Sequence, residues 1–146
     1  MTNESSIAPP LISPAITRWS AAAGVAAILG GSGMVAYFDP TQAHFFPVCP
    51  LFALTGLACP GCGLTRGFHA LFHGDIPTAL HFNALIGVWV VILVYLVVSF
   101  SLHAIRGRGL PIWMTQPKFT VWFMAVLLIF GVLRNLPFYP LTLLYP

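Results

Sequence analysis

Charged side chains are scarce in this sequence. Only 6% of its 146 residues are charged, and just three of these are acidic. Soluble domains devote about one quarter of their residues to charge, so this composition argues against a water-covered globular fold. The apolar content of 58% and the mean hydropathy of +0.90 instead predict an all-α integral membrane protein whose main partner is the lipid bilayer.

Several functional motifs are also missing. The chain shows no serine–histidine–acid set, no paired carboxylates and no phosphate-binding glycine loop, which disfavours hydrolases and nucleotide-binding proteins. Its six basic residues form no run and do not alternate with aromatic residues, so we expect no nucleic-acid partner. On a membrane protein such residues set the orientation and contact anionic headgroups.

Three apolar stretches predict transmembrane helices, at residues 16–38, 84–104 and 119–136. At about 1.5 Å per helical residue, stretches of this kind cross a hydrocarbon core of about 30 Å. The proline-rich residues 1–15 predict a disordered tail, which leaves 16–146 as a single helical membrane domain. Arg134 falls near the end of the third stretch, and we expect its side chain to snorkel to the membrane interface.

Small residues repeat every four positions in the first stretch. Such rows let helix backbones approach closely within a membrane. We expect them to pack against the other spans, or alternatively to form a homo-oligomer or bind a membrane partner. The two rows are Ala23, Ala27, Gly31 and Ala22, Ala26, Gly30.

Basic residues also predict the orientation. Arg106, Arg108 and Lys118 lie between the second and third stretches, and clusters of this kind favour the cytoplasmic side. We therefore expect a multi-pass protein of the cell membrane with a cytoplasmic N-terminus. The segment 39–83 and the C-terminal tail then face outward.

The segment 39–83 is apolar but interrupted by prolines, which predicts a partly embedded segment of short helices. A helix is expected from about Gly63, with Gly74 as its left-handed cap. Asp75 then caps a second short helix that carries Pro77 in its first turn. Asn83 is expected to cap the entry to the second transmembrane helix.

The same segment resembles a domain-of-unknown-function family of small bacterial multi-pass membrane proteins. Its signature, CPxCGxTR, reads CPGCGLTR here, and an upstream Cys-Pro, a Gly-Asp and an Asn accompany it. One departure is that Ala84 stands where the family has proline after the Asn. The resemblance implies a multi-pass membrane protein and no established reaction. The matching positions are Cys49, Pro50, Cys59, Pro60, Cys62, Gly63, Thr65, Arg66, Gly74, Asp75 and Asn83.

The three cysteines allow three chemistries. Cys49, Cys59 and Cys62 could bind zinc with His69 or His73 as a further ligand; no other cofactor is expected. Cys59 and Cys62 could instead be catalytic, since a C-x-x-C at a helix start favours the thiolate. A structural disulfide could also join Cys49 to one of the pair. In each case we expect the three sulfurs to cluster.

Arg66 follows the cysteines within an apolar stretch, where a charge is costly. It could pair with Asp75 or bind an anionic lipid or small ligand. The leading hypothesis for the whole protein is a structural or assembly role organised around the CPGCGLTR turn. The alternatives are an envelope thiol–disulfide oxidoreductase and ligand binding through Arg66, so enzymatic activity stays open.

Overall fold

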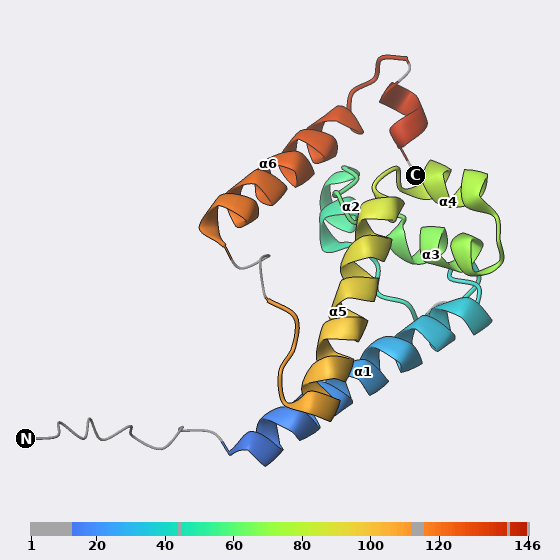
Figure 1. The fold of residues 1–146 in the computed structure, drawn as a ribbon. Helices are drawn as coiled ribbons and strands as arrows, with labels where there is room; N and C mark the ends of the chain where they lie inside the picture. Colours follow the sequence, from blue (N-terminus) through green and yellow to red (C-terminus); the bar gives the residue numbers. More distant parts are fainter. Residues whose placement is uncertain (1–12, 44, 112–115, 140, 146) are drawn as a thin grey trace, which may run out of the picture.

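The computed structural model describes residues 13–43, 45–111, 116–139 and 141–145, and this part of the chain is helical without any strand (Figure 1). The all-α prediction is confirmed. Most of the expected disordered tail lies outside the described residues, but Pro14 and Ala15 already belong to the first helix. The elements are α1 (Pro14–Tyr37), α2 (Pro50–Thr55), α3 (Leu64–Phe72), α4 (Ile76–Phe82), α5 (Ile86–Arg106), α6 (Pro117–Leu133) and a 3-10 turn η2 (Leu141–Leu144).

In the described part of the chain, two helices, and not the expected three, are long and apolar enough to cross a membrane. These are α1 with 24 residues and α5 with 21 residues, whereas α6 is apolar but has only 17. The expected third stretch reached residue 136, but the helix ends at Leu133 with Arg134 as its cap. Pro137 follows closely, and a proline disfavours helical backbone at the residue before it. The side chains of Arg134 and Asn135 then bond to other segments.

Helices α1 and α5 pack against each other with the start of α1 beside the end of α5 (Figure 1). The Arg18 guanidinium donates to the carbonyl oxygens of Ala104 and Ile105, at 2.9 and 3.1 Å. A cation suits this position because the last carbonyls of a helix lack partners and carry partial negative charge. Further along, Gly24 lies against Phe100, and a Cβ there would come within 3.1 Å of the ring.

The small-residue rows of α1 do not pack against the other long helices, although the sequence predicted that they would. Helix α1 approaches α5 through Gly24, which belongs to neither row, while no side chain lies near Gly30 or Gly31. This face is therefore open, and a homo-oligomer or membrane partner on it stays a prediction. The exposed members of the two rows are Ala23, Ala26, Ala27, Gly30 and Gly31.

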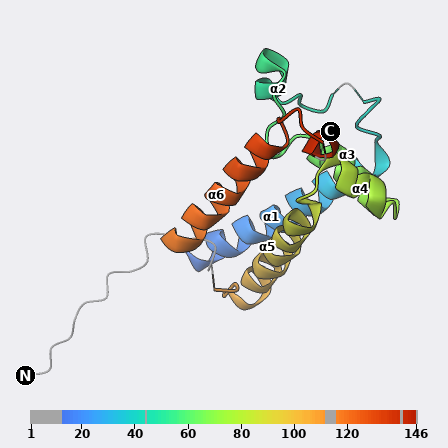
Figure 2. The same ribbon diagram turned by 90° about the horizontal axis from the view of Figure 1, so that it is seen from above.

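Helix α6 stands apart from the α1–α5 pair and ends near the short helices, which gather at one end of the molecule (Figure 2). Trp89 of α5 and Phe123 of α6 meet edge to face, with ring centroids 6.1 Å apart. At the other end of α6, Gly131 faces Pro60, and a Cβ on it would lie 3.0 Å from the proline ring. The end of α6 is thereby set against the cysteine-bearing turn.

The local signals in segment 39–83 were predicted correctly. Gly74 has the left-handed φ of 80°. Asp75 caps α4, since its Oδ1 accepts from the Thr78 N–H at 3.1 Å. Asn83 accepts from the Leu85 N–H at 2.9 Å, at the entry to α5.

Candidate three-cysteine centre

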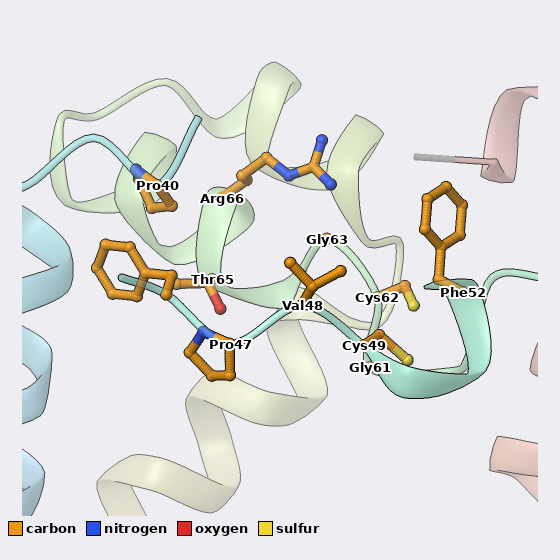
Figure 3. Close-up of a pocket in the computed structure, with 11 residues that line it drawn as sticks. Pro40, Pro47, Val48, Cys49, Phe52, Gly61, Cys62, Gly63, Thr65 and Arg66 are labelled. Atoms are coloured by element: carbon orange, nitrogen blue, oxygen red, sulfur yellow. The ribbon is translucent and has the colours of Figure 1, made fainter. Parts of the chain in front are cut away.

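The sulfur atoms of Cys49, Cys59 and Cys62 all lie within 4.8 Å of one another, as expected from the sequence. Cys49 is the N-cap of α2, and the other two belong to the turn that precedes α3. Figure 3 shows the side chains of Cys49 and Cys62 side by side. Cys62 is buried, whereas Cys49 and Cys59 are half-buried, so the cluster is sheltered but remains accessible.

The CPGC sequence folds as a tight turn. The Cys62 N–H donates to the Cys59 carbonyl oxygen at 3.0 Å, as in a β-turn with Pro and Gly at its centre. In return, the Cys59 N–H donates to the Cys62 sulfur at 3.1 Å. The two sulfurs are only 2.9 Å apart. Gly63 then takes a φ of 79° and starts α3.

Arg134 holds this turn from the end of α6. Its side chain is only 1% exposed, so the expectation that it snorkels to the interface is wrong. The guanidinium donates to the carbonyl oxygens of Cys59 at 2.9 Å, Cys62 at 3.0 Å, Leu144 at 3.1 Å and Phe82 at 3.4 Å. The planar group with its five donors suits such a site, because four carbonyls from three segments converge on it.

Two asparagines complete the support. Asn83 is fully buried and donates to the carbonyl oxygens of Pro60 at 2.9 Å and Cys62 at 3.2 Å. Asn135 pairs with the Ala58 backbone in both directions, with each hydrogen bond at 2.8 Å. The turn is thus fixed by side chains from α6 and from the α4–α5 corner.

Sequence reasoning missed the roles of Arg134 and Asn135. A signal was available, because a chain with three acidic residues offers its arginines few carboxylates. An arginine at the end of an apolar helix must then find backbone carbonyls or lipid headgroups. Nothing in the sequence indicates which carbonyls these are.

The thiols of Cys49 and Cys62 differ in acidity. The N–H of Phe52 in the first turn of α2, together with Cys59, lowers the pKa of Cys49 to about 7. Burial and the neighbouring Cys59 thiol raise the pKa of Cys62 to about 12. Cys49 is therefore the thiol that ionises near neutral pH, whereas Cys62 gives up its proton only to a strong partner such as a metal ion.

A cavity of about 230 Å³ opens beside the cysteines, and Arg66, Thr65 and Val48 line it with Cys49 and Cys62 (Figure 3). The predicted ion pair between Arg66 and Asp75 does not form. Its guanidinium carbon lies 5.4 Å from the centre of the Phe82 ring. Asp75 instead bonds the backbone at the start of α4, and these hydrogen bonds from Thr78 lower the pKa of its carboxyl.

The two histidines considered as metal ligands lie elsewhere. His69 and His73 line a second cavity of about 280 Å³, on the other side of Arg66. The group of clustered ligand atoms found among the described residues contains only the three cysteines. In this structure neither His69 nor His73 is the fourth ligand of that group.

The cysteine cluster fits a thiophilic metal ion. Zinc bound by thiolates has Zn–S distances of about 2.3 Å, which three sulfurs within 4.8 Å of one another can reach with small adjustments. Three protein ligands leave one position of a tetrahedral ion open for water or another ligand. The same three sulfurs are also close enough to exchange disulfides with one another.

These features define an all-helical protein with two helices that fit a membrane span and a sheltered three-cysteine centre. Residues 49–97 match the model of a protein family of unknown function, DUF2752. This match confirms the resemblance predicted from CPGCGLTR, and it begins at the first of the three cysteines. No curated protein and no solved structure matches the chain.

Proposed function

We propose that this protein is a multi-pass membrane protein whose three-cysteine centre binds one zinc-like ion. The observation that carries the proposal is the convergence of Cys49, Cys59 and Cys62 within 4.8 Å. The ion would connect α2 to the turn before α3, which gives the CPGCGLTR turn a structural role. Its open coordination position would face the 230 Å³ cavity.

The charge of Arg134 supports this proposal. Three thiolates around a divalent ion carry one net negative charge, and a buried charge needs compensation. Arg134 supplies a buried positive charge within hydrogen-bonding distance of the Cys59 and Cys62 backbone. Its hydrogen-bond partners among the described residues are all neutral backbone carbonyl groups, so no carboxylate there competes for it.

Metal analysis of the purified full-length protein tests the proposal. We expect about one zinc per chain, and serine substitution of any of the three cysteines should lower this amount sharply. His81→Ala is a matched control, because His81 is an exposed potential ligand on α4. Protein that contains no metal after purification and binds none from added zinc would overturn the proposal.

A second candidate function is thiol–disulfide exchange with a disulfide-bonded envelope protein. The proximity of the three sulfurs, all within 4.8 Å of one another, and the low pKa of Cys49 favour it. The Cys49 thiolate would attack a substrate disulfide and release one substrate thiolate. The Cys59 thiolate would then attack the Cys49 sulfur, which releases the second substrate thiolate and leaves a Cys49–Cys59 disulfide. A dithiol protein would have to reduce this bond.

Mass spectrometry after alkylation separates the two candidates. A zinc protein should yield three alkylated cysteines once the metal is chelated. An exchange enzyme trapped in its oxidised form should yield one alkylated cysteine and one internal disulfide. A permanent disulfide that resists mild reductants would instead support the purely structural role.

The membrane arrangement is also part of the proposal. Apolar side chains such as Val91 and Val94 of α5 and Leu128 and Ile129 of α6 are exposed, as expected of surfaces covered by lipid. With 17 residues, α6 is about 25 Å long and sits at the lower limit for a span. We take it as a third span, with the N-terminus in the cytoplasm and the cysteine centre at the outer face.

A further inference from the structure

A second polar site shares Arg66 with the cavity beside the cysteine centre. Its cavity of about 280 Å³ is enclosed by α3, α4 and the segment after α1. His69 and His73 of α3 contribute two imidazoles, and Asp39 and Asp75 contribute carboxylates. The cavity has no part in the proposed three-cysteine centre, so its chemistry is a separate question.

Backbone carbonyls orient both imidazoles. The Nδ1 of His69 lies 2.7 Å from the Val35 carbonyl oxygen, and the Nδ1 of His73 lies 2.9 Å from the His69 carbonyl oxygen. A carbonyl oxygen can only accept, so each Nδ1 must carry the proton. In each neutral ring the lone pair is therefore on Nε2. Histidines that bind metals are typically oriented in this way, with the ring nitrogen that does not bind the metal donating to a carbonyl.

The two rings are also close enough to share one ion. Residues four apart lie on the same face of a helix, and here the ring centroids are 4.4 Å apart. Zn–N bonds are about 2.0–2.1 Å long, so two rings at this separation can reach the same ion. The i, i+4 spacing is the one by which helices present two histidines to zinc.

The charges around the cavity favour a cation. Asp39 and Asp75 oppose the single positive charge of Arg66, which leaves one negative charge in excess when the imidazoles are neutral. Hydrogen bonds from Thr41 and from Thr78, respectively, lower the pKa values of Asp39 and Asp75. Both carboxylates are therefore ionised at neutral pH.

We propose that His69 and His73 bind a divalent transition-metal ion through their Nε2 atoms, at a site separate from the cysteine centre. Water completes the coordination, and the nearby carboxylates add electrostatic attraction. Imidazole ligands suit zinc, copper and nickel. Because His73 is exposed, this site can exchange its ion with the surroundings, unlike the sheltered cysteines.

Cobalt titration of the full-length protein in detergent tests this proposal. Cysteine ligands give a sulfur-to-cobalt charge-transfer absorption, whereas imidazole and water do not. We expect a calorimetric binding event that lacks this absorption and that His69→Ala and His73→Ala each weaken by at least about 100-fold. Loss of a residue that only hydrogen-bonds to a metal ligand weakens metal binding by up to about 100-fold, and loss of a ligand itself should weaken it at least as much. His81→Ala should leave the event unchanged.

Two variants that each remove one charged side chain test whether the charges around the cavity favour a bound cation. Arg66→Gln should tighten cobalt binding roughly two- to fivefold, and Asp75→Asn should weaken it to a similar extent, as for partly exposed charges. Asparagine retains the cap of α4, so the second variant should keep its fold. Weaker cobalt binding in Arg66→Gln would overturn the proposal.

The outcomes also separate the two metal proposals. A histidine-dependent event without any charge-transfer absorption would refute the cysteine centre and support this site. Charge-transfer absorption with no event that depends on His73 would do the reverse. His73 is exposed, so a loss of binding in His73→Ala cannot be attributed to unfolding if circular dichroism is unchanged.

Discussion

Replacing Arg134 with methionine removes the group that gathers four carbonyls from three segments. Methionine has a comparable length and no donor, so it isolates the hydrogen bonds and the charge. Two of the four acceptors keep another donor, since Cys59 accepts from the Cys62 N–H and Cys62 accepts from Asn83. Phe82 and Leu144 lose the hydrogen bond that Arg134 makes to them.

The expected loss follows from these two acceptors. A buried polar group left without a partner costs about 1–3 kcal/mol, so Arg134→Met should destabilise the protein by about 2–6 kcal/mol. For a chain of this size, each kcal/mol corresponds to about 2–4 °C in Tm. Thermal unfolding in detergent, followed by circular dichroism, should therefore show a decrease of at least roughly 5 °C.

Arg66→Met is the matched control. Arg66 is only partly buried, and its guanidinium makes a cation–π interaction with Phe82, worth about 0.5–1 kcal/mol at such sites. Its Tm should fall by no more than roughly 4 °C. Equal Tm values for the two variants would refute the central role of Arg134 and would return it to the interfacial position expected from the sequence.

Three further predictions concern packing, acidity and orientation. Gly131→Ala should cost about 1–3 kcal/mol because its Cβ would press on Pro60, whereas Gly30→Ala in open space should not destabilise; equal Tm values would contradict the packing. In metal-free reduced protein, alkylation of Cys49 should rise as pH increases through about 7, while Cys62 stays unreactive below about pH 9; equal rates would contradict this difference. A reporter fused after the C-terminus should be active only outside the cytoplasm, and cytoplasmic activity would reverse the proposed orientation.

The parts of the fold that depend on local chemistry could be predicted from the sequence. Gly74 and Asp75 each produce their turn or cap through neighbours within a few residues, so the sequence contains the whole cause. The bounds of α1 and α5 follow in the same way from apolar length. The position of the Arg134 side chain does not, because its partners are distant in the sequence.

In the candidate site, too, the features with local causes were predicted and those that depend on distant residues were not. The clustering of the cysteines was predicted because Cys59 and Cys62 share one turn and Cys49 precedes them closely. The predicted pairing of Arg66 with Asp75 was wrong because it rested on the small number of acidic residues and not on where Asp75 lies in the fold. Asp75 is already engaged by the N–H of Thr78, and a carboxylate that caps a helix is held where that helix begins.

The match to the family of unknown function covers residues 49–97, which includes the cysteines and Asn83 but not Arg134 or Asn135. Within the matched segment, the turn carbonyls of Pro60 and Cys62 are satisfied by Asn83. The buried positive charge beside the turn comes entirely from the end of α6. The matched segment therefore has the three cysteines and part of their support, but not the charge that would balance three thiolates around a divalent ion. In this chain the last helix supplies that charge, so α6 belongs to the site even though its sequence lies outside the motif.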